Sequence, residues 1–443
     1  MALNDEMATI AGAATALRDR DVSAAELLGQ VLDRLHATEP VVRAYAHVDE
    51  DGARAAAARA DEALAQGEPL GPLHGIPVAV KDVIAVADMP LEAGSRALAG
   101  RVADHDAEVV SRLRRGGAVI VGKTITHELA FGQNTPPTRN AYDPEREPGG
   151  SSAGSAVATA VGSALAAIGT DGGGSVRHPA ALNGVVGLKP TYGLIDTAGV
   201  LAMGPSLEHL GTFTRTVEDC ALFLSAIAPC PAPAWRNDLA GARLGVLRSF
   251  VEASDRDVQE AFAAASGLLR DLGAELVDVD IPEIELAVPV GLALVLPESA
   301  DAFGQVPRAD SSRLEPGTRA LLAAGGLVTA GDYLVARRAR PVVQAAVRGA
   351  FQDHRLDGLI CPSAPAPAGP AESEEPAMKR LARPLRLHMW ANVTGMPSVS
   401  VPCGRSADGL PLGIQLAAAP FAESRLLAIA AAFERAARSV LAS

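Results

Sequence analysis

Aromatic residues are scarce in this chain, whose 443 residues include only 9 Phe, 4 Tyr and 2 Trp. Apolar residues still make up 48% of the sequence, so the core must consist mainly of Ala, Val, Leu and Ile. A chain of this length can bury roughly three quarters of its unfolded surface. The composition therefore predicts a large globular protein with an aliphatic core.

An excess of positive charge is also lacking. The chain has 39 Lys and Arg against 52 Asp and Glu, a formal net charge of −13, whereas nucleic acids and anionic membranes attract basic surfaces. The run that comes closest to a membrane span, residues 153–170, is rich in Gly and Ala and is a poor candidate. We therefore predict no nucleic-acid partner and no membrane partner.

Cysteine is too sparse to suggest a disulfide framework or a zinc site. Cys220, Cys230, Cys361 and Cys403 are scattered, and none forms a C-x-x-C pair. Reduced thiols are typical of the cytosol, and residues 1–21 lack the basic and apolar segments of a signal peptide. The sequence therefore predicts a cytoplasmic protein.

Segments with helical periodicity alternate with short apolar segments, which favours an α/β sheet covered by helices on both faces. Helices are expected at about 23–38, 52–66, 107–115, 217–226, 255–272 and 423–441. Strands are expected at about 76–80, 118–121, 243–247, 277–281, 359–361, 399–401 and 413–417. Residues 285–350 are helix-prone and contain no recognisable motif.

We expect one large domain spanning residues 1–443. Within it we distinguish N-terminal helices at about 5–66, a core at about 70–225 and a C-terminal α/β portion at about 242–443. The Pro-rich segment at 229–241 is the best boundary candidate, and we interpret it as a surface connection within that domain.

Two clusters of glycine and serine, Gly149–Ser152 and Gly172–Ser175, lie in the region from 148 to 191. Glycine allows unusual backbone dihedral angles, and its N–H groups can converge on an anion without obstruction by side chains. Between the clusters, residues 153–167 are mostly small and contain neither proline nor charge. That composition predicts a tightly packed buried helix.

Two familiar motifs occur, and the sequence argues against both. Residues 117–124 match the P-loop pattern, but a phosphate loop must expose its N–H groups, whereas Ala-Val-Ile-Val at its centre predicts a buried strand. Residues 150–154 match the nucleophile elbow G-x-S-x-G, which needs a preceding strand and a later histidine. The charged segment at 143–148 is no central strand, and no histidine lies in a context that marks a base.

Lys81 ends the apolar segment at 76–80. A lysine at a strand end is often simply solvated, but a buried lysine loses its proton more readily and can act as a base. Ser151 and Ser175 have an ordinary interpretation too, as capping residues at helix starts. Each residue, taken alone, leaves a structural and a catalytic role open.

Together, these segments resemble the amidase signature family. The resemblance is carried by Leu73–Asp82, the Gly149–Ser152 cluster, Gly169–Arg177 and Gly187–Thr191. It continues through Val121–Thr124, Glu128, Arg215–Asp219, Asn392–Pro397 and Gly409–Gln415. It extends from about residue 10 to 437, and it implies one large α/β domain with a central twisted mixed sheet covered by helices on both faces.

Members of this family use a triad of two serines and a lysine. The resemblance places the nucleophile at Ser175, the bridging serine at Ser151 and the base at Lys81, with a cis peptide bond between Gly150 and Ser151. Neutral Lys81 would draw a proton from Ser151 and, through it, from Ser175. Ser175 would then attack the carbonyl carbon and form an acyl-enzyme that water hydrolyses.

The resemblance also implies an oxyanion hole and a supporting set of residues. The oxyanion hole would consist of the backbone N–H groups of Gly172, Gly173, Gly174 and Ser175. The residues expected to hold the loop are Ser152, Asp171 and Arg177. Neither a metal ion nor an organic cofactor is implied.

Three positions depart from the family's pattern. Ala153 follows the paired serines where Gly is common, Gly172 stands where a larger residue is usual, and His178 is uncommon after Arg177. We expect Gly172 to make the loop more flexible and to leave room near the scissile group. Because no triad member is lost, catalysis should persist with an altered substrate preference.

We interpret the protein as a hydrolase that cleaves a C–N bond of small non-peptide amides, with esters, anilides and carbamates (urethanes) also open. Its partner would be a small-molecule amide or carbamate, and a homodimer is compatible with the sequence. The main alternative is the A-type subunit of a tRNA-dependent amidotransferase, which generates ammonia from glutamine. A binding scaffold with a dead site is disfavoured, because Lys81, Ser151 and Ser175 are all present.

The sequence does not identify the acyl pocket. Candidate segments are Leu129–Gln133, Leu201–Ser206 and residues 285–350. Met389 and Trp390 are further candidates, although core packing is the stronger interpretation of each.

Overall fold

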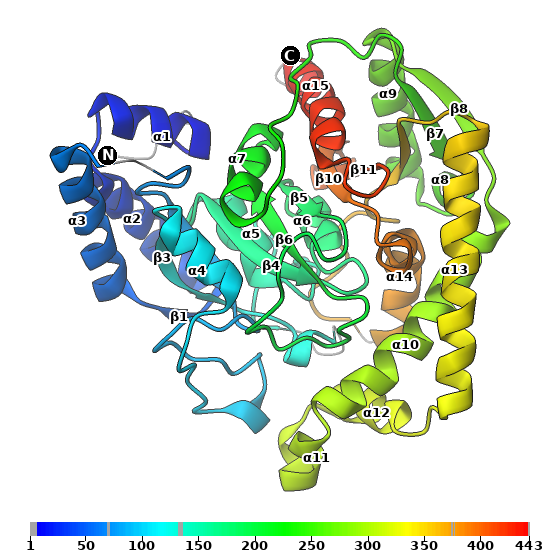
Figure 1. The fold of residues 1–443 in the computed structure, drawn as a ribbon, viewed down its shortest axis with the longest axis horizontal. Coiled ribbons are helices and arrows are strands. Elements are labelled where there is room, and N and C mark those ends of the chain that lie inside the picture. Colours follow the sequence, from blue (N-terminus) through cyan, green and yellow to red (C-terminus); the bar gives the residue numbers. More distant parts are fainter. Residues whose placement is uncertain (1–6, 69–70, 132–135, 374, 376, 442–443) are drawn as a thin grey trace.

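An 11-stranded mixed sheet forms the centre of the protein (Figure 1). The computed structural model describes residues 7–68, 71–131, 136–373, 375 and 377–441. The strand order is β1-β3-β2-β4-β6-β5-β10-β11-β9-β7-β8, so one sheet joins the N-terminal and C-terminal parts of the chain. This confirms the predicted single α/β domain with a mixed sheet.

The strands are β1 (Tyr45–Val48), β2 (Pro77–Lys81), β3 (Val119–Thr124), β4 (Ala166–Asp171), β5 (Val186–Lys189), β6 (His209–Thr214), β7 (Arg243–Leu247), β8 (Glu275–Val279), β9 (Gly358–Pro362), β10 (Ser398–Arg405) and β11 (Pro411–Ala417). The α-helices are α1 (Ile10–Asp19), α2 (Ala24–Val42), α3 (Glu50–Gln66), α4 (Glu108–Arg115), α5 (Ala153–Val161), α6 (Arg177–Leu182), α7 (Val217–Ile227), α8 (Arg248–Glu252), α9 (Arg256–Asp271), α10 (Ala287–Ala302), α11 (Gln305–Asp310), α12 (Pro316–Gly325), α13 (Ala330–Asp353), α14 (Ala377–Thr394) and α15 (Glu423–Leu441).

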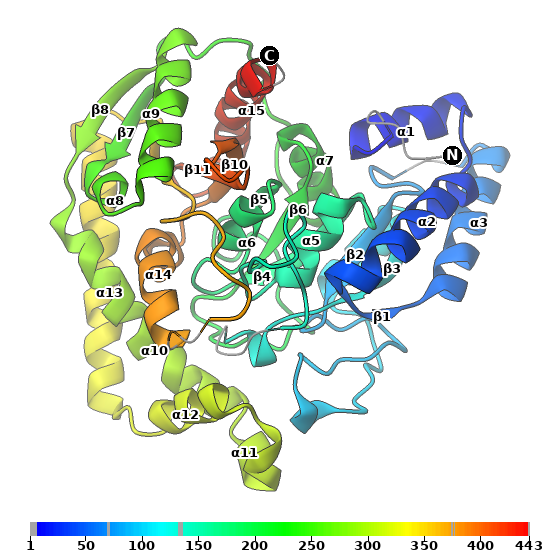
Figure 2. The ribbon, with the colours of Figure 1, turned by 180° about the vertical axis from the view of Figure 1, so that it is seen from behind.

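Helices cover both faces of the sheet. Helices α7, α9 and α15 pack on β6 and β10 on one face, while α5 and α6 pack on β4, β5 and β10 on the other (Figures 1 and 2). The helix-prone region at 285–350 forms α10 to α13, of which α10 and α13 pack against α14 (Figure 1). The core is aliphatic, as the composition predicts.

The centre of the sheet sets the position of the site. Strands β2 and β4 run parallel and adjacent, with Val80 paired to Ile168. Because parallel strands present their carboxyl ends at the same edge, Lys81 at the end of β2 and Asp171 at the end of β4 lie at one edge of the sheet. Such edges are where open α/β sheets bind ligands.

The prediction of one buried helix over residues 153–167 was wrong in its second half. Helix α5 ends at Val161, because Gly162 adopts a left-handed conformation and its N–H bonds to the carbonyls of Ala158 and Thr159. Strand β4 begins at Ala166. Small apolar residues fit a buried helix and a buried strand equally well, so periodicity alone does not separate the two.

Other expected elements are confirmed, with shifted ends. The capping box of Ser23 and Glu26 begins α2, which continues through Pro40 to Val42 rather than ending near Thr38. The sequence analysis did not identify α1, α6, α8, α14, β1, β5 and β6 as separate elements. The short strands among them contain only four to six residues each, too few to show a clear period.

The structure also agrees with the rejection of both motifs. The end of the P-loop match, Val119–Thr124, is the fully buried strand β3, and Lys123 Nζ donates to Asp82 Oδ1 at 3.0 Å. The segment at 143–148 before the G-x-S-x-G match is no strand. Neither segment therefore has the setting that its motif requires.

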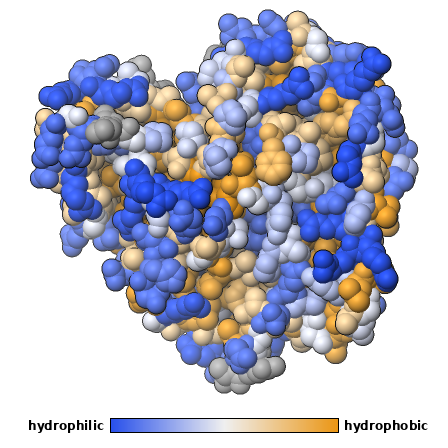
Figure 3. Space-filling view, viewed as in Figure 1, coloured by the Kyte–Doolittle hydropathy of each residue, from blue (hydrophilic) through white to orange (hydrophobic). Residues whose placement is uncertain are grey.

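One face of the surface mixes hydrophilic residues with small groups of hydrophobic ones (Figure 3). None of the helices in the described ranges combines the length and the apolar character that crossing a bilayer requires.

Candidate active site

Four chain segments converge at the edge where β2 and β4 end. Strand β2 supplies Lys81, and the loop before α5 supplies Ser151 and Ser152. Strand β4 ends at Asp171, and the loop between β4 and α6 supplies Ser175. The two glycine-serine clusters are therefore the loops that lead into two buried helices, which brings together residues far apart in the sequence.

Lys81 is completely buried. Its Nζ donates to Ser151 Oγ at 2.9 Å and to Thr170 Oγ1 at 2.8 Å. Burial lowers the pKa of Lys81 to about 7, while the carboxylates of Glu208 and Asp171 act in the opposite direction. Lys81 is therefore buried and not solvated, unlike an ordinary lysine at the end of a strand. A substantial fraction of its amine is neutral near neutral pH.

Ser151 follows a cis peptide bond between Gly150 and Ser151. It does not cap a helix, because the residue at the start of α5 is Ser152, whose side chain makes no capping bond. Ser175 does not cap one either, since Val176 holds that position before α6. The capping interpretation of both serines is therefore contradicted.

Ser175 lines a cavity together with Ser151. Among the described residues, the Ser175 hydroxyl makes no hydrogen bond, and its carbonyl accepts one from the Ser152 N–H at 3.3 Å. Hydrogen bonds between catalytic groups are often loose before substrate binds. Ser175 therefore lines the cavity with no competing hydrogen bond to its hydroxyl from the described residues.

The glycine loop leaves several N–H groups available. The Gly174 N–H donates to Asp171 Oδ1 at 2.7 Å, whereas those of Gly172, Gly173 and Ser175 have no acceptor within the described part of the chain. Gly174 has a φ of 116°, and a Cβ there would lie 2.7 Å from the His388 side chain. Only glycine fits this position.

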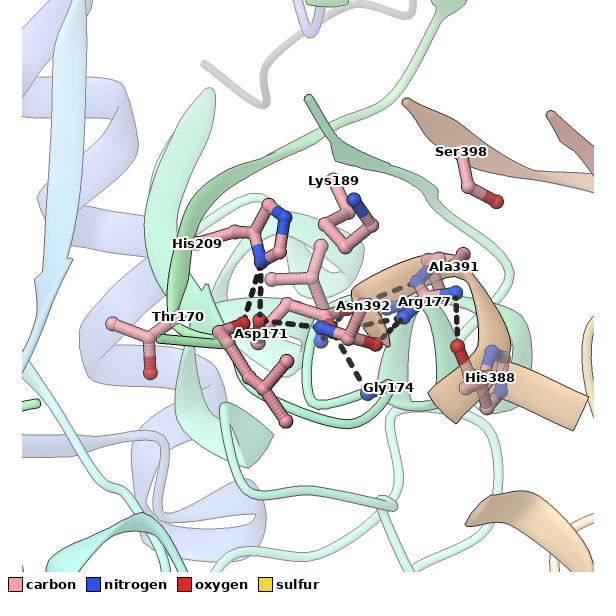
Figure 4. Close-up of polar contacts among 12 residues, drawn as sticks. Thr170, Asp171, Gly174, Arg177, Lys189, His209, His388, Ala391, Asn392 and Ser398 are labelled. Carbon is pink, nitrogen blue, oxygen red and sulfur yellow. Dashed lines mark hydrogen bonds and ion pairs between the residues drawn. The ribbon is translucent and has the colours of Figure 1, made fainter. Parts of the chain in front are cut away.

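A buried ion pair holds this loop (Figure 4). Asp171 accepts hydrogen bonds from Arg177 Nη2 at 2.9 Å and Arg177 Nε at 3.0 Å, and from Asn392 Nδ2 at 2.9 Å. Burial alone would raise the pKa of Asp171, but the charge and hydrogen bonds of Arg177, with Asn392, hold it well below its usual range. Asp171 is therefore ionised at neutral pH.

The same network fixes the state of His388. Gln415 Oε1 accepts from Arg177 Nη1 at 2.9 Å and lies 3.0 Å from His388 Nδ1. Since that oxygen only accepts, His388 Nδ1 must carry the hydrogen, and Nε2 is an acceptor. Burial lowers the pKa of His388 well below its usual value, and Nε2 has no partner among the described residues. A neutral imidazole thus borders the cavity.

The cavity beside Ser175 is mainly apolar. Its described lining residues are Ala130, Phe131, Gly150, Ser151, Gly172, Gly173, Gly174, Ser175, His178, Met203, Leu292, Val295, Leu296, Leu321, Met378, Leu381, Pro384, Leu385, His388 and Met389. No side chain in this set carries a fixed charge. Burial lowers the pKa of His178, so that imidazole is neutral at neutral pH too.

Each of the three candidate pocket segments contributes to the lining. The first segment contributes Ala130 and Phe131, the second contributes Met203, and the third contributes four residues between 292 and 321. Residues 132 and 133 of the first candidate segment lie outside the described residues. Met389 lines the cavity, whereas Trp390 packs in the core and donates to the Leu387 carbonyl at 2.9 Å.

Several residues of the site escaped the sequence analysis. Helix α14 contributes Leu381, Leu385 and His388, and nothing in its sequence marks that role. Gly172 lines the cavity beside Ser175, and a Cβ at this position would lie 3.3 Å from Met203 Cε. These contacts join distant segments, so sequence spacing carries no signal for them.

No group of three or more His, Cys, Asp or Glu within the described ranges is arranged to hold a metal ion. The site instead contains hydroxyls, one buried amine and a loop of backbone donors.

Comparison with known proteins identifies the family. A model of the amidase family matches residues 26–427. The chain belongs to the amidase signature family. An amidase of Pseudomonas putida is 42% identical over 97% of this chain and 96% of its own. The A-type subunit of the glutamyl-tRNA(Gln) amidotransferase of Chloroflexus aurantiacus is 38% identical, over 96% of both chains.

Solved structures of amidases share the fold. A crystal structure of an amidase superposes with a TM-score of 0.89 at 33% identity, over 96% of this chain and 99% of the other. The amidase signature resemblance and its implied fold are therefore confirmed, and the protein is an amidohydrolase of that family. These relatives include both hydrolases and amidotransferase subunits, so family membership does not choose between those activities.

Proposed function

We propose that the protein hydrolyses small, largely apolar amides through an acyl-enzyme on Ser175. Lys81 is the base, Ser151 relays the proton and Ser175 is the nucleophile. The support is the 2.9 Å contact of Lys81 Nζ with Ser151 Oγ, and the cavity that Ser151 and Ser175 line together.

The proposed reaction proceeds in two halves. Neutral Lys81 accepts the Ser151 hydroxyl proton while Ser151 accepts that of Ser175, and Ser175 Oγ bonds to the substrate carbonyl carbon. When the tetrahedral intermediate collapses, the C–N bond breaks, Ser151 protonates the departing amine, and Lys81 returns its extra proton to Ser151. Water then attacks the ester, the acid leaves, and Ser175 regains its proton.

Backbone N–H groups would stabilise the negative charge that develops on the substrate carbonyl oxygen in the tetrahedral intermediate. Those of Gly172, Gly173 and Ser175 lack other acceptors within the described residues, which supports their role in the oxyanion hole. Gly174, whose N–H is already bonded to Asp171, would shape the loop instead of donating. Asp171, Arg177 and Ser152 would support the loop.

We infer the class of substrate from the residues that line the cavity. Glutamine would bring an ammonium and a carboxylate, and burying either without a charged partner is costly. Among the described lining residues, none offers such a partner, whereas Leu292, Leu385 and Met389 offer apolar contact. An aliphatic or aryl acyl group fits this environment.

A substrate panel tests the proposal. Phenylacetamide, hexanamide and their anilides should be hydrolysed with release of ammonia or aniline, and glutamine should not. The Ser175→Ala variant serves as the blank for each substrate. Turnover of glutamine alone would overturn the assigned substrate class.

A second candidate is the A-type amidotransferase subunit, which the 38% identity to the Chloroflexus aurantiacus protein favours. That activity would require partner subunits and glutamine. Expression in a bacterial host, followed by affinity capture and light scattering, distinguishes a lone chain or a homodimer from a hetero-complex. Amide hydrolysis by the lone chain, without glutaminase activity, contradicts the second candidate.

Esters and carbamates pass through the same type of tetrahedral intermediate, so we include both, in matched pairs with the amides, in the panel.

We propose a cytoplasmic location because Cys220, Cys230, Cys361 and Cys403 are all unpaired.

A further inference from the structure

Glu208 is a buried carboxyl group next to the base. It directly precedes β6, whose pairing with β4 places Thr170 opposite Leu210 and Asp171 opposite His209. The residue is only 4% exposed. A Cβ at Gly172 would lie 3.7 Å from both Glu208 carboxyl oxygens, so this side chain reaches the start of the glycine loop.

Thr170 interacts with both Lys81 and Glu208. Lys81 Nζ donates to Thr170 Oγ1 at 2.8 Å, and the Thr170 side chain, by interacting with the Glu208 carboxyl group, lowers the pKa of that group. A hydroxyl has one hydrogen, so accepting from Lys81 leaves Thr170 free to donate onward. Glu208 Oε2 also accepts from the Met203 N–H at 3.1 Å, which fixes the carboxyl group.

We propose that Glu208 is a positioning residue that sets the protonation state of Lys81, with which it shares one proton through Thr170. This inference rests on the proposed role of Lys81 as the base. The shared proton either leaves an ammonium beside a carboxylate or an amine beside a carboxylic acid. Both arrangements hold the same number of protons, so the pair changes tautomer without exchange with solvent.

The surrounding charges are consistent with this pairing. Burial raises the pKa of Glu208 to about 7, against the lowering effect of Lys81. Asp171 acts on both members of the pair, but it is held ionised by Arg177 and contributes a constant charge. The field at Lys81 therefore varies with the protonation of Glu208.

Two further buried ionisable groups, His209 and Lys189, interact with Asp171. Burial, with the charge of Lys189, lowers the pKa of His209 well below its usual value, so His209 is neutral. Lys189 Nζ is held by two backbone carbonyls, those of Met396 at 2.6 Å and Pro190 at 3.0 Å. Burial lowers the pKa of Lys189 well below its usual value.

The kinetic test is the pH profile of kcat/KM for Glu208→Gln. Glutamine keeps the shape and removes the negative charge that raises the pKa of Lys81. Lys81 then loses its proton at lower pH. The acid limb, which is the rise of kcat/KM on the acidic side of the profile, should therefore shift to lower pH by about one pH unit. At a given pH on that limb, kcat/KM should be an about tenfold larger fraction of its plateau value than in the wild type. An unmoved limb overturns the proposal, even if kcat falls.

Two further variants separate charge from structure. Glu208→Asp keeps the carboxylate and should keep the limb within a few tenths of a unit of the wild type. Glu434→Gln removes another buried carboxyl group, on α15, whose partners Val217 and Arg438 lie outside the site, and should leave the limb in place. A shift in Glu434→Gln equal to that of Glu208→Gln would contradict a specific pairing.

Thermal unfolding tests the same point without any substrate. A group whose pKa is raised by folding loses its stabilising effect as pH rises through that pKa, so the wild type should lose stability relative to Glu208→Gln between pH 5 and 7. The lower pKa of Lys81 in the variant acts in the same direction. If the wild type shows this pH-dependent loss of stability relative to Glu208→Gln while no substrate of the panel is hydrolysed, the proposed function is wrong and the pairing stands. A constant difference in Tm overturns the pairing itself.

Discussion

Lys81 Nζ lies 2.9 Å from Ser151 Oγ, with both side chains almost completely shielded from solvent. The first prediction follows from that burial, which lowers the pKa of Lys81 to about 7. The base acts only without its proton, so kcat/KM should rise with pH through about 7. Initial rates from pH 5 to 9 check this, and a flat profile would contradict the assignment.

Lys81→Met should lower kcat by about 10²- to 10⁴-fold, the usual contribution of a general base. Methionine fills the same volume without an amine, so circular dichroism should show an intact fold. If the variant changed only KM, Lys81 would be a binding residue and not the base.

Ser175→Ala should reduce turnover by about 10⁴-fold or more, because no acyl-enzyme can form. A sulfonyl fluoride probe followed by peptide mass spectrometry should label the wild type at Ser175. Ser152 is fully buried and its Oγ donates to the Thr170 carbonyl at 3.1 Å, so it should remain unlabelled. Labelling at Ser152 would support the nucleophile elbow instead.

Arg177→Met should destabilise the fold by about 3–5 kcal/mol, because it leaves the buried Asp171 carboxylate without its cation. Without Arg177 the pKa of Asp171 should rise, so the variant should lose less stability, relative to wild type, as pH falls and that carboxyl group is protonated. Thermal unfolding at pH 5 and 8 measures both effects. Adding Asp171→Asn should recover part of the loss.

The matched control for that prediction is Arg256→Met. Arg256 pairs with Glu260 at 2.7 Å, but its side chain is 89% exposed. Exposed pairs contribute about 0–1 kcal/mol, so Tm should hardly change. A loss as large as that of Arg177→Met would show that the buried pair has no special weight.

Met389→Ala should enlarge the acyl cavity, since a Cβ at Gly173 would lie 3.0 Å from Met389 Cε and the methionine therefore packs directly on the glycine loop. The preference for phenylacetamide over acetamide should rise by about tenfold or more, the scale on which pockets discriminate between hydrocarbon groups. Met396→Ala removes another buried methionine that is not among the cavity's described lining residues. Ratios of kcat/KM that move equally in both variants would argue against the proposed pocket.

Much of the fold could be predicted from local sequence. The ends of α7, α9 and α15 fall within two residues of their expected positions, because each helix has a regular apolar face and a clear stop. The buried segment at 153–167 could not be divided correctly, since the break depends on the left-handed conformation of Gly162 and on the pairing of β4 with β2.

The sequence by itself determined the family, the order of the motifs and the residue types at Lys81, Ser151 and Ser175, because these are properties of spacing along the chain. The tertiary structure decided what surrounds them. It removed Lys81 from water, placed the Glu208 carboxyl group near Thr170 and the glycine loop, and packed α14 over that loop. Desolvation and through-space charge depend on segments more than a hundred residues apart, and only folding brings those together.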